Sequence, residues 1–69
     1  MIVEITSRRA REFKDLLTQC RGEDFKLLDS QRLIRQDQDG EPYHCSTEIW
    51  EITGPSQSLV ALKHPQWAV

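Results

Sequence analysis

Four side chains carry the thiol and imidazole groups that most often bind transition metals: Cys20, His44, Cys45 and His64. They form neither a CxxC nor an HxxxH pattern, which are spacings typical of metal sites. His44 and Cys45 are neighbours in a predicted strand, so their side chains point to opposite faces and do not readily share one ion. Cys20 completes an apolar helical pattern. We therefore expect no metal site and no cofactor, and whether His44, Cys45 or His64 has a chemical role stays open.

Catalysis would need a base, a partner group and a pocket that holds the substrate. A pair of His44 with the carboxylate of Glu48 is conceivable, and His64 is the other imidazole. None of the motifs GxSxG, GxGxxG or GxxxxGK[ST] occurs in the chain. A single domain of 69 residues encloses little space. We expect the protein not to be an enzyme; the enzymatic alternative is a small enzyme whose site lies at a dimer interface.

Charge is segregated along the chain. Residues 7–22 hold five cations and two anions, a net charge of +3, whereas residues 37–51 hold five acidic residues and no Lys or Arg. The whole chain has a net charge of −2, which excludes a uniformly basic nucleic-acid-binding protein. Lobes of opposite charge can complement a charged partner or a second copy of the chain. The basic lobe is therefore the first candidate for a binding site.

The basic lobe places three arginines at the start of a predicted helix. The helix dipole favours acidic groups there, so each cation lowers the stability of the helix by about 0.3 kcal/mol or more. Clustered arginines beside free N–H groups suit a carboxylate or a phosphate. We predict that Arg8, Arg9 and Arg11, together with Lys14, bind an anionic group of a partner. The alternative is an ordinary solvated face of the helix.

Nucleic-acid binding is the second hypothesis for the same residues. Arg8, Arg9, Arg11 and Lys14, joined by Arg32 and Arg35 on a predicted strand, could form a face that contacts phosphates. Tyr43 or Trp50 could stack on exposed bases. The acidic segment 37–51 would repel the same backbone unless it lies on the opposite side of the molecule.

The element that positions the basic lobe is an amphipathic helix. Residues 1–6 are largely β-branched and predict a strand. Ser7 can serve as the N-cap of a following helix, and Gly22 suits a left-handed C-cap. The spacing of the apolar residues predicts a helix over 8–21. Its apolar face comprises Ala10, Phe13, Leu16, Leu17 and Cys20.

The second half of the chain reads as strands. Residues 25–36 and 43–52 flank Asp39-Gly40, a strong signal for a two-residue hairpin turn. Gly54-Pro55 marks a further break, and residues 58–64 predict a last strand that Pro65 ends. The two-residue turn would pair Gln38 with Glu41. In that register neither face is cleanly apolar, so either the loop is longer or a bulge near Ser46 and Thr47 switches the faces.

These elements predict an α+β fold in β-α-β-β-β order. We expect one domain over residues 1–69 with a mainly antiparallel sheet, one helix packed on one face, and a short tail at 65–69. Strand register and sheet order stay open. The absence of a long apolar run, of a secretory leader and of a cysteine framework predicts a cytoplasmic protein without a membrane segment.

Two tryptophans bear on the partners of this domain. Trp50 lies inside a predicted strand and is expected in the core. Trp67 lies in the tail, where it either folds back on the domain or binds a partner. A small domain with open sheet edges also favours a homodimer. We therefore expect a small protein-binding regulatory or accessory factor whose partner and biological process the sequence does not identify.

Overall fold

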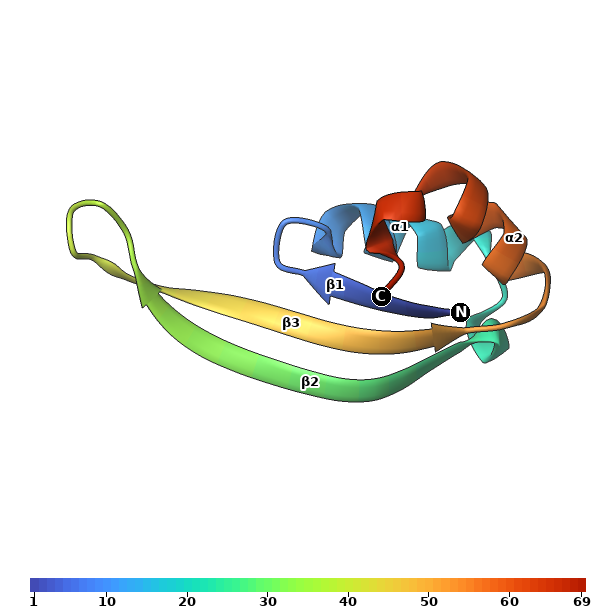
Figure 1. The fold of residues 1–69 in the computed structure, drawn as a ribbon, viewed down its shortest axis with the longest axis horizontal. Coiled ribbons are helices and arrows are strands. Elements are labelled where there is room, and N and C mark those ends of the chain that lie inside the picture. Colours follow the sequence, from blue (N-terminus) through green and yellow to red (C-terminus); the bar gives the residue numbers. More distant parts are fainter.

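Three antiparallel strands and two helices make up residues 1–69 in the computed structural model, which describes the whole chain (Figure 1). The predicted α+β class with an antiparallel sheet is therefore confirmed. The order is β-α-β-β-α. The elements are β1 (Ile2–Thr6), α1 (Ala10–Gln19), β2 (Phe25–Gln36), β3 (Pro42–Ile52) and α2 (Gly54–Lys63), with 3-10 turns η1 (Gly22–Asp24) and η2 (Pro65–Trp67).

The sheet has the order β1-β3-β2, and its strands differ in length. β1 pairs with β3 only as far as Thr6 opposite Thr47, so β2 and β3 continue past it as a two-stranded arm, which we define as residues 32–46. The arm projects from the body in Figure 1. It makes the molecule 43 Å long and 21 Å wide, with a radius of gyration of 13.4 Å. A compact domain of this length would have a radius of about 11 Å.

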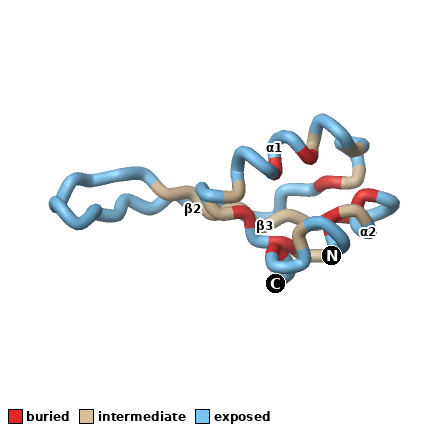
Figure 2. The backbone as a smooth tube through the Cα atoms, turned by 90° about the horizontal axis from the view of Figure 1, so that it is seen from above, coloured by how far each residue is buried: buried red, intermediate tan, exposed pale blue.

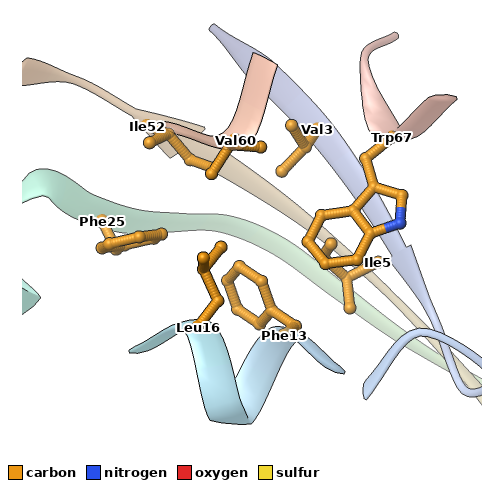
Figure 3. Close-up of a cluster of buried hydrophobic side chains, with 8 residues drawn as sticks. All are labelled: Val3, Ile5, Phe13, Leu16, Phe25, Ile52, Val60 and Trp67. Carbon is orange, nitrogen blue, oxygen red and sulfur yellow. The ribbon is translucent and has the colours of Figure 1, made fainter. Parts of the chain in front are cut away.

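The hydrophobic core lies wholly in the body. Both helices cover the same face of the sheet, and Figure 3 shows their side chains meeting those of the strands. Figure 2 shows the buried residues gathered in the body, while the arm has none. Because the arm gains no stability from the core, it is held by strand pairing and, at its base, by the hydrogen bonds between Ser7 and Ser46. The core consists of Val3, Ile5, Phe13, Leu16, Phe25, Ile52, Val60 and Trp67.

The predicted last strand at 58–64 is wrong, because this segment is helix α2. Gly54 adopts a positive φ of 64°, and Pro55 sits at the first turn, where its fixed φ suits a helix start. Ser56 and Val60 are buried four residues apart on one helical face. The apolar run Leu59-Val60-Ala61-Leu62 is compatible with a strand and with a helix. The residues that precede it, Gly54 and Pro55, favour the helix.

The ends of α1 also differ from the prediction. The helix begins at Ala10 rather than Arg8, and its N-cap is Arg9, which makes no side-chain capping bond. Ser7 is not the N-cap, because its hydroxyl is bonded to Ser46 on β3 instead. Gly22 has no left-handed conformation and opens the turn η1.

The hairpin closes with a longer loop than the two-residue turn that Asp39-Gly40 predicts. The Asp37 N–H donates to the Glu41 carbonyl at 3.0 Å, and the Asp37 carboxylate accepts the N–H groups of Asp39 and Glu41 at 2.9 Å. Gly40 takes the positive φ of 81° that the turn requires. Of the two alternatives that the sequence left open, a longer loop or a bulge near Ser46 and Thr47, the longer loop is the correct one.

A β-bulge lies on β2 at Leu28 and not near Ser46 on β3, where the sequence allowed one. Leu27 pairs with Trp50, whereas Asp29 already pairs with Ile49. The extra residue moves alternate side chains of β2 to the other face. Leu27 therefore lies on the helix side of the sheet, whereas Leu33, further along the strand, lies on the side away from the helices.

Candidate functional site

A basic hollow of about 530 Å³ lies at the base of the arm, where β1 ends and β3 continues. The turn that joins β1 to α1, drawn in blue in Figure 1, supplies Ser7, Arg8 and Arg9 to its lining. The hollow is an open depression whose walls come from that turn, from β2 and from β3. Its ten lining residues include Arg8, Arg9, Arg35, Tyr43, His44 and Ser46.

A contact between Ser7 and Ser46 builds the hollow. The Ser46 N–H donates to the Ser7 hydroxyl at 2.6 Å, and that hydroxyl lies 3.2 Å from the Ser46 carbonyl oxygen, to which it donates. Ser7 thus takes the place of the next β1 residue in the ladder and holds the turn against β3. Arg9 is fixed in addition, because its Nη1 donates to the Glu4 carbonyl at 2.8 Å. These bonds place Arg8 and Arg9 beside the arm.

The electrostatics of the hollow are one-sided. No carboxylate lines it, whereas Arg8, Arg9 and Arg35 all do. The ion pairs of the structure join Arg21 to Glu23 and His64 to Glu12, so the three guanidinium groups of the hollow have no carboxylate partner within 4.0 Å. Guanidinium groups without a carboxylate partner can bind an oxyanion through their remaining N–H groups.

A smaller hollow of about 310 Å³ adjoins the first along β3. It shares His44, Cys45 and Ser46 with the basic hollow and adds Arg32 from β2. Hydroxyl, imidazole and guanidinium donors therefore line both depressions. Such donors suit a carboxylate or a phosphate group that reaches over the arm.

The structure brings together only part of the predicted basic cluster. Arg8 and Arg9 line the basic hollow, but Arg11 and Lys14 lie on the exposed surface of α1 outside it. The N–H groups of the helix start are also less free than expected, since those of Arg9 and Ala10 donate to Thr6 and Ser7 carbonyls. The site is therefore built across the turn and the arm rather than on the helix N-terminus.

Trp67 is a core residue, which corrects the hypothesis that it binds a partner. Its side chain is 1% exposed, and its ring centroid lies 6.1 Å from that of Phe13. His64 stacks on its outer side at 3.8 Å with an interplanar angle of 4°. An Ala68 bridge to Val3 holds the tail against β1. The tail folds back on the domain, which was the other possibility that the sequence allowed.

The conceivable His44–Glu48 pair does not form. The two residues are four apart on one extended strand, so their Cα atoms are separated by about 13 Å. His64 instead lies 3.8 Å from Glu12. No three His, Cys, Asp or Glu side chains lie close enough to hold a metal ion. Both cysteines are free and partly buried.

Sequence reasoning named Arg35 only in the nucleic-acid hypothesis and did not connect it with Arg8 and Arg9. The sequence indicates His44 as a candidate metal ligand or as a base paired with Glu48, and not as a wall of an anion site. No local signal links these residues, because the Ser7–Ser46 contact that joins them spans 39 positions of the chain.

Comparisons with known proteins give no relative for this chain. No protein-family model matches it, and neither a curated protein nor a solved structure resembles it significantly. Neither helix has the length and apolar character that a membrane-spanning segment requires.

Proposed function

We propose that the protein is a non-catalytic, protein-binding regulatory or accessory factor of the cytoplasm, and that its basic hollow holds an acidic group of the partner. The observation that carries this proposal is the hollow itself. Three guanidinium groups from two separate segments line one depression that contains no carboxylate. Guanidinium groups bind carboxylates and phosphates through paired hydrogen bonds.

The arm supports the same function. Ile34 is 69% exposed on one face of the arm, and Leu33, 45% exposed, lies on the other face together with Tyr43. Aromatic side chains and arginine are enriched at protein interfaces, where they combine apolar contact with polar anchoring. A partner that reaches the hollow can also contact these side chains, because both surfaces belong to the same arm.

The test compares two triple variants of equal charge. The first, Arg8→Gln/Arg9→Gln/Arg35→Gln, removes the cations of the hollow, and the control, Arg11→Gln/Lys14→Gln/Lys26→Gln, removes three cations outside it. The probe is a fluorescent glutamate-rich peptide, titrated at two salt concentrations. Exposed ion pairs contribute about 0.5–1 kcal/mol each, so we expect the first variant to bind about 10–100-fold more weakly.

The control variant should keep the affinity of the unmodified protein within about twofold, because its cations are remote from the hollow. Equal weakening of both variants would show a diffuse charge effect and would refute a defined site. The proposal is also wrong if the unmodified protein shows no saturable binding of the peptide.

Nucleic-acid binding is the second candidate, and one observation favours it. Arg35 lines the basic hollow together with Arg8, Arg9, Tyr43 and His44, and Arg32 lines the smaller hollow that adjoins it on the arm. Titration with labelled single- and double-stranded DNA and RNA at the same two salt concentrations tests it. A nucleic-acid complex weakens steeply with salt through counterion release. Micromolar, salt-steep binding that the first variant loses would replace the protein-binding proposal.

A further inference from the structure

The two outer edges of the sheet differ in whether another part of the chain covers them. The tail covers the β1 edge, because Val3 bridges to Ala68 and the Val69 N–H donates to the Ile2 carbonyl at 3.0 Å. The outer edge of β2 has no neighbouring strand along its whole length, Phe25–Gln36. An uncovered edge of this length is a template for another strand.

The hydrogen bonds of Ser46 reveal which β2 groups face outward. Its N–H and carbonyl point to Ser7, away from β2, so its partner Arg32 directs its own backbone groups to the open edge. Because backbone groups alternate in direction along a strand, the N–H and carbonyl groups of Ile34 and Gln36 also point to the open edge. Ser30 also faces outward, but its N–H already donates to the Asp29 carboxylate at 2.9 Å. The Ser30 carbonyl still faces the open edge, so the segment that can pair runs over residues 30–36, with the Ser30 N–H as the one outward group that is already bonded.

We propose that this edge pairs with the same edge of a second copy of the chain, antiparallel and about a two-fold axis at Leu33. A two-fold axis perpendicular to the sheet places the helix-covered faces of both copies on the same side. Each residue of one β2 strand is therefore opposite a residue of the other β2 strand whose side chain lies on the same face. With the axis at Leu33, the two Leu33 side chains face each other. Arg32 then lies opposite Ile34 of the second copy, and Gln31 lies opposite Arg35.

The neighbouring registers are worse for identifiable reasons. An axis at Arg32 would place two guanidinium groups directly opposite each other, which is destabilising. An axis at Gln31 would bring the bulged residue Leu28 opposite Ile34 and disturb the ladder. An axis at Ile34 would shorten the paired segment from residues 30–36 to residues 32–36. The register at Leu33 has none of these defects.

Side chains along the edge complement themselves in this register. Leu33, paired with Cys45 in its own hairpin, meets its symmetry mate and forms an apolar row across four strands. Ile34, which is 69% exposed in one copy, is covered by the aliphatic part of Arg32. Arg35 lies diagonal to Asp29 of the second copy, which pairs opposite charges twice about the axis. These features favour a second copy over an unrelated strand.

The dimer goes beyond the proposed function and does not depend on it. Nine of the ten residues that line the basic hollow belong to β1, to the β1–α1 turn or to β3, away from the pairing edge. Arg35 on β2 is the exception, because in the dimer it lies diagonal to Asp29 of the second copy, so Arg8 and Arg9 are the cations of the hollow that stay open. Two sites on one rigid dimer would bind a partner with two acidic groups more tightly than one site does.

Disulfide trapping tests the register. In a Cys20→Ser/Cys45→Ser background, Leu33→Cys should form an intermolecular disulfide in most chains under mild oxidation. Directly opposed residues of a non-hydrogen-bonded pair have Cα atoms about 4.5 Å apart, which a disulfide can span. The control is Gln31→Cys, whose symmetry mate lies four residues off register and should not be trapped. Trapping of Gln31→Cys instead, or of neither variant, would overturn the proposed register.

Sedimentation at protein concentrations of about 1–100 µM tests the dimer itself, because this range covers the dissociation constants of weak specific dimers. We expect a species of twice the 8.1 kDa chain mass. Ile34→Pro removes an outward N–H and should give a folded monomer by circular dichroism. The control His44→Pro places proline at the paired position on the other edge of the arm and should remain dimeric. A monomeric unmodified protein at the highest concentration, or equal loss of the dimer in both variants, would overturn the proposal.

Discussion

Replacing Trp67 with alanine separates a structural role of the tail from a binding role. The indole is 1% exposed and contacts Phe13, and Figure 3 shows it lying over Ile5. A tryptophan buries about 200 Å² on folding, which at about 25 cal/mol per Å² corresponds to about 5 kcal/mol. Substitutions of this kind cost about 3–5 kcal/mol in practice. A domain of this length has a total stability of about 3–10 kcal/mol, so Trp67→Ala should remove most of it.

Urea unfolding followed by circular dichroism measures this loss, and the fluorescence of the remaining Trp50 gives an independent probe. Leu62→Ala is the matched control, because Leu62 is 80% exposed on α2. Its effect should stay within about 0.5 kcal/mol, as for other surface substitutions. An unchanged urea midpoint for Trp67→Ala would refute the placement of the indole in the core and restore the partner-binding hypothesis.

Two further predictions concern the packing of the helices and are measured by the same unfolding experiment. Phe13→Ala should cost about 3–5 kcal/mol, whereas Leu17→Ala should cost about 1–2 kcal/mol, because Leu17 is only partly buried at the edge of the core; equal losses would show that the two side chains are equally buried. Ser56→Ala should cost about 1–2 kcal/mol, because the buried Ser56 hydroxyl donates to the Asp24 carboxylate at 2.7 Å and the carboxylate would lose a charge-assisted bond. A neutral Ser56→Ala would mean that this bond does not tie α2 to the turn before β2.

The sequence predicts the parts of the fold that local patterns determine. The predicted apolar face of α1 is confirmed except at Ala10, which is exposed; Phe13 and Leu16 are buried, and Leu17 and Cys20 pack against the core. The strands on either side of the Asp39-Gly40 turn are also confirmed. The boundaries of α1 were wrong because Ser7 has a stronger use elsewhere: its hydroxyl completes the ladder with a distant strand.

Helix α2 shows where local patterns fail. A short apolar run fits a strand and a buried helix equally well, and only its context separates them. The signals for a helix were present in the pair Gly54-Pro55 and in the spacing of Ser56, Leu59 and Val60. The strand was nevertheless expected there because the run contains β-branched and aliphatic residues and ends at a proline.

The sequence predicts that the candidate site is basic, but it does not predict which arginines come together. Their position at the start of the predicted helix singles out Arg8, Arg9 and Arg11 as unusual cations, and two of them, Arg8 and Arg9, line the hollow. Their association with Arg35 follows from the length of β2 and β3 relative to β1, which leaves room for a hollow at the base of the arm. No residue near Arg8 in the sequence carries that information.

The core residues and the arm, which carries the proposed pairing edge, lie in different parts of this chain. Every buried apolar residue lies outside residues 26–51, and the eight of them hold the two helices on the sheet. Within the arm, Leu33, Ile34 and Tyr43 remain exposed although strand pairing would permit polar residues there. Because folding gains little from these side chains, their apolar character is best explained by contacts that form only when the arm meets another surface. Under the proposed function the arginines of the hollow have the same explanation, because an anionic group of the partner would supply the carboxylate partner that they lack in the free protein.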